Sequence, residues 1–525
     1  MTSVVGVAPP DTRPPDAVDP PPADVRAGWL VPLAVVAVVL LRLPYLWAPM
    51  SPDEGGFLAV GAQWNGRGTS LYGSYWVDRP PLLITVYQLA AWAGGLTALR
   101  LIGCVAAALT VWCCAGAAGN IAGRRARSCT ALVAAALLAS PILGVVPVNG
   151  ELLATPFVAG SALAATSAVA RGRSRTGCLA TALTAGLLSV GALLVKQNMA
   201  DGVVFTALLW CFAWLRGSID GRRFRRLLAC FAAGAVGALA VVTLWILLRG
   251  TSPGGVLYAM YPFRIKAAGV MTARSTGPNL ARLHRLLSDW ILSGIPLVLV
   301  ALAGQLVRVR FNRPAHVALL GMAAYSTVSV LAGGNYWNHY LVETIVPAAL
   351  CAGALAVDRI ALARLMTALL VAGSLVAWGI GLVAWSGSGG LDAGRSIAAV
   401  AGPHDTIVVA FGDADLVRAA GLRSPYPYLW SLPTHTLDPR LSRLGDTMRG
   451  PAAPTWLVVR GPSTYAYLSR HDGALIRSHY HAVTELCNRT VYLRNGVSRR
   501  TPGVPSSCRA PLVPAFASTG LRTHI

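Results

Sequence analysis

Apolar segments about as long as the hydrocarbon core of a bilayer recur along the chain as far as residue 386, and polar sequence dominates afterwards. Short segments rich in arginine separate these apolar stretches. The pattern predicts an α-helical polytopic membrane protein with about 11 transmembrane helices. We place the spans near residues 29–48, 98–121, 129–146, 152–170, 178–195, 202–215, 227–248, 289–307, 316–332, 340–357 and 365–386.

The arginines indicate how the spans are oriented, because short cytoplasmic loops carry an excess of basic residues. Five clusters follow this rule: Arg124, Arg125 and Arg127; Arg171, Arg173 and Arg175; Arg216, Arg222, Arg223, Arg225 and Arg226; Arg308, Arg310 and Arg313; Arg359 and Arg364. All five are cytoplasmic only if residues 80–94 do not cross the membrane. That segment begins with two prolines and is shorter than the ~20 residues a span needs, so we expect an interfacial helix on the outer face.

This topology divides the chain into three parts. Residues 1–28 are rich in proline and aspartate and lack a signal-peptide pattern, so we expect a disordered cytoplasmic tail. Residues 29–386 form the membrane domain, whose first outer loop covers residues 49–97. In residues 387–525, short apolar runs at 406–411, 455–459 and 490–493 alternate with helical patterns near 392–401 and 438–449, which predicts a small extracytoplasmic α/β domain.

Composition excludes two broad classes. With 55% hydrophobic residues, 12% charged residues and a mean hydropathy of +0.57, the chain cannot be an ordinary soluble domain. The net charge of +23 comes from the clusters between spans, so no nucleic-acid partner is expected. Eight of the ten cysteines lie in or beside apolar segments as small hydrophobic residues, whereas Cys487 and Cys508 lie in the polar C-terminal region, where a disulfide can form outside the cytoplasm.

Although it rests on arginines, the topology brings most of the other unusual polar residues to one face. The chain has only two lysines and four glutamates. At or near the outer face lie Asp53, Glu54, Asp78, Arg79, Glu151, Lys196, Asn198, Asp201, Lys266, Asn335 and His339. Charges at a membrane boundary carry a desolvation cost, so this convergence predicts an active site there.

The chain resembles a known superfamily in the motifs around these residues. They are Ser51-Pro52-Asp53-Glu54-Gly55-Gly56-Phe57, Asp78-Arg79-Pro80-Pro81-Leu82-Leu83, Asn149-Gly150-Glu151 and Leu194-Val195-Lys196-Gln197. In combination they resemble the GT-C glycosyltransferases, and most closely the bacterial family 39 proteins similar to dolichyl-phosphate-mannose-protein mannosyltransferases and aminoarabinose transferases. The likeness covers residues 29–200 well, continues more weakly through residues 335–340, and matches the C-terminal domain loosely.

The resemblance implies a cell-membrane enzyme that transfers a sugar with inversion from a polyprenyl-phosphate-linked donor to a lipid, glycan or protein acceptor on the outer face. Asp53 matches the acid of the family's first loop and is the expected general base, with Glu54 as the alternative. Ser51-Pro52-Asp53-Glu54 also reads as a capping box with Ser51 as N-cap, Pro52 at N1 and Glu54 at N3. Both readings hold together if Glu54 caps the helix and Asp53 faces the site.

Three further positions match residues that the family uses for the donor phosphate: Arg79, Lys196 and His339. Each could instead be structural, as a snorkelling cation or a packed histidine. Glu151 and Asp78 could orient the acceptor or bind a divalent metal ion, although the family commonly has Thr-Glu where this chain has Gly150-Glu151. Glu151 could also simply complement a helix N-terminus.

Weaker candidates are Arg42 and an outer loop at residues 249–289, which carries Tyr261, Arg264, Lys266 and Arg274 and could cover the donor. Residues 425–430 could hold the acceptor or pack on the membrane surface. The alternative to an enzyme is a polytopic lipid or sugar transporter or flippase, although internal repeats and charges at the bilayer midplane are not evident. A catalytically silent scaffold protein does not explain why acidic and basic residues gather on one face either. The donor sugar and the need for a metal ion stay open.

Overall fold

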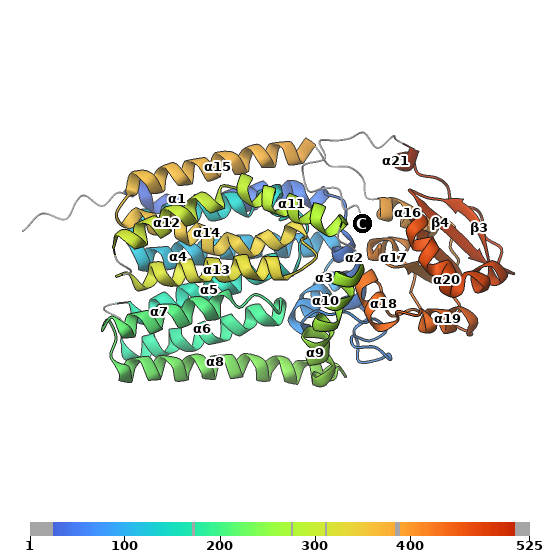
Figure 1. Ribbon diagram of the computed structural model, residues 1–525, viewed down its shortest axis with the longest axis horizontal. Helices are drawn as coiled ribbons and strands as arrows, with labels where there is room; N and C mark the ends of the chain where they lie inside the picture. The colour runs from blue at the N-terminus through green and yellow to red at the C-terminus, as the bar shows by residue number, and fades with distance from the viewer. Residues whose placement is uncertain (1–24, 171–173, 275–276, 310–311, 384–388, 510–525) are drawn as a thin grey trace, which may run out of the picture.

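The computed structural model describes residues 25–170, 174–274, 277–309, 312–383 and 389–509. A bundle of long helices fills one end of the molecule, and a smaller part with a mixed sheet lies at the other end (Figure 1). The expected tail therefore lies almost entirely outside the described residues.

The helical part runs to residue 383. Its elements are α1 (Val25–Arg42), η1 (Leu43–Trp47), α2 (Pro52–Gln63), α3 (Pro81–Trp92), α4 (Leu96–Leu137), η2 (Pro141–Leu143), α5 (Gly150–Val169), α6 (Arg175–Val195), α7 (Asp201–Leu215), α8 (Gly221–Leu248), α9 (Pro253–Met260), α10 (Pro262–Arg274), α11 (Gly277–Leu292), α12 (Ile295–Arg308), α13 (Pro314–Ala332), η3 (Asn338–Thr344), α14 (Ile345–Ala354), η4 (Leu355–Val357) and α15 (Ile360–Val383).

Eight of these described helices are long and apolar enough to cross a membrane, and a bent pair, residues 279–292 with Ile295–Arg308, brings the number to nine. On α8, which lies along one edge of the bundle (Figure 1), large apolar side chains such as Val236, Val241 and Leu248 are exposed. Such a surface suits lipid rather than water. The chain is a multi-pass membrane protein by these criteria, although they do not yield the eleven spans we expected.

Two features explain the difference in the number of spans. Helix α4 contains two antiparallel helices, because Gly123 leaves helical geometry at φ 77°. A Cβ placed on Gly119 would lie 3.9 Å from the Cβ of Arg127, whereas eight residues of straight helix advance about 12 Å. Helix α7, the expected span 202–215, has only 15 residues, so it is too short to be counted among the candidate spans.

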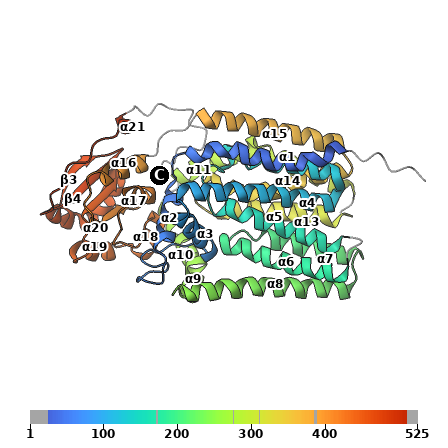
Figure 2. The ribbon, with the colours of Figure 1, turned by 180° about the vertical axis from the view of Figure 1, so that it is seen from behind.

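Residues 49–97, which we expected to form the first outer loop, contain the short helices that the sequence indicates. The apolar segment 80–94, which we expected not to span, forms helix α3 of 12 residues. Helices α2 and α3 lie between the long helices and the sheet (Figure 2). The α7–α8 connection, which begins with Arg216 and leads into Arg222 in the first turn of α8, lies at the far end of the bundle from the sheet (Figure 2). The arginine-rich end and the end that carries the proposed site are thus opposite.

The C-terminal part is the small α/β structure that the sequence predicts. It consists of α16 (Gly389–Ala398), β1 (Ile407–Ala410), α17 (Ala414–Ala420), α18 (Ser431–Leu437), α19 (Ser442–Arg449), β2 (Trp456–Arg460), α20 (Gly461–His479), β3 (Tyr480–Glu485), β4 (Arg489–Arg494) and α21 (Ser506–Arg509). The strand order is β1-β2-β4-β3. Strand β1 pairs in parallel with β2, and the other pairs are antiparallel.

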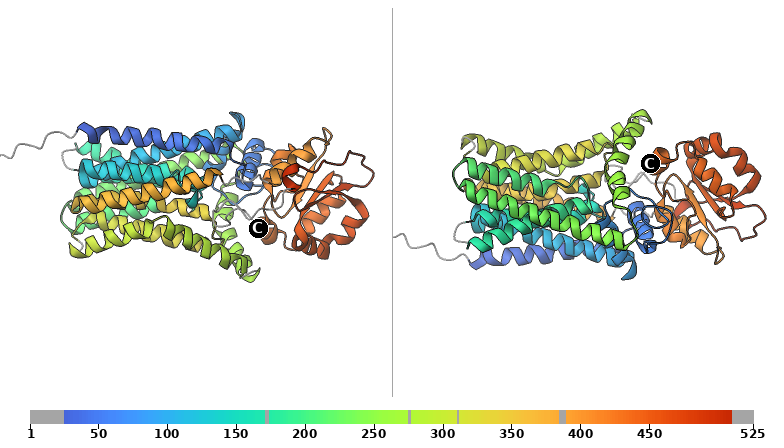
Figure 3. Two further views of the ribbon diagram at one scale, coloured as in Figure 1. Left: turned by 90° about the horizontal axis from the view of Figure 1, so that it is seen from above. Right: turned by 90° about the horizontal axis from the view of Figure 1, so that it is seen from below.

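This part packs on the first outer loop and is not a separate body. Views from above and below both place it at one end of the bundle, next to α2 (Figure 3). The Trp76 amide donates to the Pro427 carbonyl at 3.1 Å, and the Tyr75 hydroxyl accepts from the Ser424 amide at 3.0 Å. Residues 425–430 therefore pack on this loop, and Gly412-Asp413 forms the turn into α17. Cys487 and Cys508 form a disulfide.

Candidate active site

The first turn of α2 has the capping box expected from its sequence. Ser51 Oγ accepts from the Glu54 amide at 3.2 Å, Glu54 Oε2 accepts from the Ser51 amide at 3.0 Å, and Pro52 occupies the first helical position. These contacts satisfy amide donors that would otherwise be unpaired at the helix start. They also fix the position of Asp53 in the first turn of α2.

Glu54 is fully buried, and its carboxylate accepts hydrogen bonds from three separate parts of the chain. Arg100, on α4, donates to it through Nε at 3.1 Å and through Nη2 at 3.0 Å. The amide of Val148 donates to the same carboxylate at 3.1 Å. Arg100 was not a candidate in the sequence, where it is one more arginine near a span end; only the tertiary fold reveals its partner.

Asp53, one residue earlier, is only partly buried and has different partners. Its Oδ1 accepts from the Trp430 indole N–H at 3.0 Å, and the Trp430 ring lies 5.1 Å from that of Phe57. Among the residues that the structure describes, Asp53 has no ion pair. Its carboxylate is therefore not held by a cation as that of Glu54 is.

Arg79 and Asp78 form an ion-pair group on the segment before α3. Arg79 Nη1 lies 2.9 Å from Asp78 Oδ1, and Arg264 of α10 lies 2.8 Å from Asp78 Oδ2. Burial lowers the pKa of Arg79, but the Asp78 carboxylate, and after it Asp53, outweigh this and hold the pKa above its usual value. The α10 helix thus brings a second arginine to the site, from the loop that we expected to cover it.

Glu151 and Lys196 form the third buried charged group. Lys196 Nζ lies 2.8 Å from Glu151 Oε1 and 5.5 Å from the Tyr340 ring centroid. Burial lowers the pKa of Lys196, and Glu151 opposes this. Asn149 caps α5 by accepting from the Leu152 amide at 3.0 Å, so the helix start that carries Glu151 is fixed without it.

His339 lies where these groups meet. The charges of Asp53, Glu151, Lys196 and Arg79 all act on its imidazole, and its ring stands edge-on to Tyr340 at 5.0 Å. With Arg264 of α10, six separate segments of the chain therefore converge on one site. We call the following residues the outer cluster: Asp53, Asp78, Arg79, Glu151, Lys196, Arg264, His339 and Tyr340.

Other candidates from the sequence lie outside the outer cluster. Arg42 is buried and donates to the Leu138 carbonyl at 2.8 Å, and Lys266 contacts the Tyr258 hydroxyl at 3.3 Å. Asp201 accepts from the Ser326 hydroxyl, and Asn198 donates to Glu343 at 2.7 Å. These last contacts form a second polar network beside the outer cluster. The side chain of Arg274 lies outside the described residues.

The outer cluster does not fit a resident divalent metal ion. Asp78 and Glu151, the acids considered for that role, are each paired with cations. In the described ranges, no group of three or more His, Cys, Asp or Glu side chains has a metal-binding arrangement.

Comparison with solved structures places this architecture among known folds. ArnT from Cupriavidus metallidurans bound to undecaprenyl phosphate is 16% identical; the match covers 90% of this chain and 98% of ArnT, with a TM-score of 0.59. The Archaeoglobus fulgidus oligosaccharyltransferase is 13% identical, over 86% of this chain and 71% of that one, with a TM-score of 0.55. The arabinofuranosyltransferase AftD from Mycobacteria is 16% identical, over 90% and 40%, with a TM-score of 0.50.

No family model matches the chain, and no curated protein matches it. The solved structures named above are GT-C superfamily glycosyltransferases. The resemblance expected from the sequence motifs is therefore confirmed at the level of the fold.

Proposed function

We propose that this protein of GT-C fold is a membrane glycosyltransferase that moves a sugar from a polyprenyl-phosphate donor to an acceptor hydroxyl on the outer face of the cell membrane. The observation that carries the proposal is the contrast between Asp53 and the acids around it. Glu54, Asp78 and Glu151 are each held in ion pairs, whereas Asp53 has none among the described residues. Asp53 is the acid available to accept a proton.

The reaction is a single displacement at the anomeric carbon. Asp53 takes the proton of the acceptor hydroxyl while the oxygen of that hydroxyl bonds to the anomeric carbon. The bond from the anomeric carbon to the phosphate oxygen breaks at the same time. The departing lipid phosphate keeps the electron pair. One carboxylate suffices for this step, and the product has inverted configuration.

Arg79, Lys196 and His339 are assigned to the donor phosphate, and Arg264 joins them. Negative charge develops on the phosphate as it departs, and cations already in place stabilise it most effectively. Arg79 and Lys196 are each partly neutralised by a carboxylate, and a guanidinium has five N–H donors, so a phosphate can bind Arg79 while Asp78 keeps one of them. Asp78 and Glu151 thus orient cations rather than bind a metal.

Glu54 is assigned to positioning the first turn of α2, because its oxygens accept from the capping amide, Arg100 and Val148.

A lipid phosphate as the leaving group agrees with the ligands of two similar structures. ArnT is bound to undecaprenyl phosphate, and an archaeal oligosaccharyltransferase of 11% identity is in complex with a dolichol-phosphate. Residues 387–525 are assigned to an extracytoplasmic domain that closes the site through Trp430.

The test is sugar transfer in proteoliposomes that contain the full chain, a panel of labelled polyprenyl-phosphate sugars and an envelope acceptor fraction. Transfer from one donor that disappears in Asp53→Asn, at equal protein abundance, is the expected result. Asp446→Asn is the matched control, since Asp446 lies on an exposed surface. Transfer that survives Asp53→Asn refutes the base assignment, and transfer from no donor with a competent acceptor fraction favours a transporter.

A further inference from the structure

A cavity lies beside α2, on a different face of the helix from the Asp53–Trp430 contact. It has a volume of about 800 Å³, and in the described part of the chain no residue of the outer cluster lines it. Leu58 of α2 lines it, and five residues of helix separate Asp53 from Leu58 by about 140° around the axis. The two sites therefore use different faces of the same helix.

One wall of the cavity is apolar and lies where two spans emerge from the membrane. Leu46, Trp47, Met50, Leu58 and Leu96 form this wall. The span that begins at Trp29 ends at Trp47, and α4 begins at Leu96. Trp47 is 76% exposed, as expected of an aromatic ring at a membrane interface. The wall is thus continuous with the lipid-facing surface.

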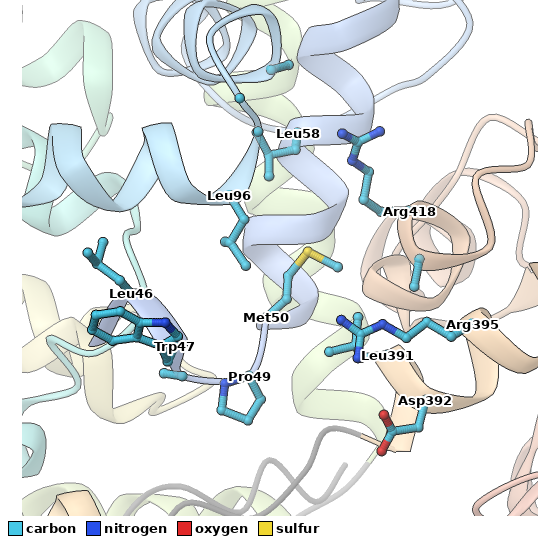
Figure 4. A pocket seen from close by; sticks show the side chains of 15 residues that line it. Leu46, Trp47, Pro49, Met50, Leu58, Leu96, Leu391, Asp392, Arg395 and Arg418 are labelled. Carbon is cyan, nitrogen blue, oxygen red and sulfur yellow. The ribbon is translucent and has the colours of Figure 1, made fainter. Parts of the chain in front are cut away.

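The opposite wall is cationic and comes from the α/β part. Arg395 of α16 and Arg418 of α17 line the cavity, and Figure 4 shows the Arg395 side chain extending toward Met50. In the described ranges neither arginine has an ion pair. Asp392 also lines the cavity, and its Oδ2 accepts from the Ser507 hydroxyl at 2.7 Å. Two unpaired guanidinium groups against one carboxylate leave a net positive charge.

A glycine turn shapes the place where Arg418 meets the membrane part. Gly94 and Gly95 have φ values of 123° and 69°, which side chains other than glycine rarely adopt. A Cβ on Gly95 would lie 3.6 Å from Arg418 Nη2. The guanidinium of Arg418 therefore lies close to the start of α4.

We propose that this cavity binds one membrane lipid with an anionic phosphate head group, its head on Arg395 and Arg418 and its hydrocarbon chain along the wall from Leu46 to Leu96. Guanidinium groups pair with phosphate oxygens through parallel N–H donors. The volume lies within the range of small-molecule sites. The site is separate from the donor site and does not depend on transfer activity.

The test is lipid binding by the full chain in detergent, measured by native mass spectrometry. The probes are phosphatidylglycerol and undecaprenyl phosphate, with phosphatidylcholine and undecaprenol as their counterparts without net charge. Wild type is expected to retain one phosphatidylglycerol, and the Arg395→Gln/Arg418→Gln double variant to bind it at least tenfold more weakly. Undecaprenyl phosphate can also occupy the proposed donor site, so only the part of its binding that the double variant loses is assigned to this cavity. Arg470→Gln/Arg477→Gln on α20 removes the same charge away from the cavity and should bind like wild type.

Two further readouts locate the lipid. Asp53→Asn should bind it unchanged, so a failure of the proposed transfer reaction does not affect this result. A diazirine-bearing anionic lipid should label residues 46–50 in wild type. Of the two anionic lipids, the one whose binding the Arg395→Gln/Arg418→Gln variant weakens more identifies the source of the head group. Binding that ignores head-group charge, or that is equal in wild type and the Arg395→Gln/Arg418→Gln variant, overturns the proposal.

Discussion

The indole N–H of Trp430 donates to the carboxylate of Asp53 at 3.0 Å, across 377 positions of the chain. This contact joins the α/β part to the first helical turn after the first span. Phe57, one turn further along α2, packs against the same ring. The proposed base is therefore oriented by a residue from the opposite end of the sequence.

Trp430→Phe should lower kcat for sugar transfer about tenfold and leave KM for the donor nearly unchanged. The substitution keeps an aromatic ring against Phe57 but removes the donor that orients Asp53, and misoriented catalytic groups lose rate rather than binding. Steady-state kinetics in proteoliposomes measure both constants. A variant with wild-type kcat would show that the hydrogen bond does not position the base.

Gly56→Ala should weaken the closure between α2 and the α/β part. A Cβ at Gly56 would overlap the Trp430 ring, and one at the neighbouring Gly55 would lie 2.6 Å from Asp415 Cα. Overpacking of this kind costs about 1–3 kcal/mol. We expect a lower Tm in detergent together with lower transfer activity.

Gly373→Ala is the matched control for this change. A Cβ on Gly373 of α15 would meet no atom within 4 Å, so its Tm and activity should stay at wild-type values. If Gly56→Ala behaves like Gly373→Ala, the close packing of α2 on Trp430 is not required.

Several features of this site follow from local sequence, and others do not. The capping box of Ser51 and Glu54 is a pattern within four residues, so it can be read directly. The Glu54–Arg100 and Asp53–Trp430 contacts depend on how distant segments pack, and nothing near Arg100 or Trp430 distinguishes these side chains from other span-end arginines and aromatics.

The same distinction applies to the elements of the α/β part. The sequence runs that form β1, β2 and β4 are apolar enough to predict. Strand β3 (Tyr480–Glu485) pairs on one side only, and most of its residues are not buried, so its pattern carries little apolar signal. Helices α17, α18 and α20 were also not expected. The two helices of α4 were expected as two separate spans. They are joined by a break at the single residue Gly123 and not by a longer loop.

Lys196→Gln should destabilise the protein by about 3–5 kcal/mol, because it leaves Glu151 buried without its partner. Their side chains are 6% and 2% exposed. The Glu151→Gln/Lys196→Gln double variant should recover much of the loss of thermal stability in detergent. Sugar transfer should stay low in both variants, since both lack the proposed phosphate ligand.

Arg449→Gln removes an exposed ion pair with Asp446 and should change neither stability nor transfer. Full recovery of transfer in the double variant would show that Lys196 acts only as the partner of Glu151.

The Cys487–Cys508 disulfide offers a test of which side of the membrane the α/β part occupies. Disulfides persist in oxidising compartments, so the proposed orientation places this pair outside the cytoplasm. Intact cells treated with a membrane-impermeant reductant and then an impermeant maleimide should be labelled on the C-terminal part. The Cys487→Ser/Cys508→Ser variant, which keeps the eight cysteines of the helical part, measures the background. Labelling that appears only after the cells are permeabilised would place the α/β part, and with it Trp430 and the outer cluster, on the cytoplasmic side.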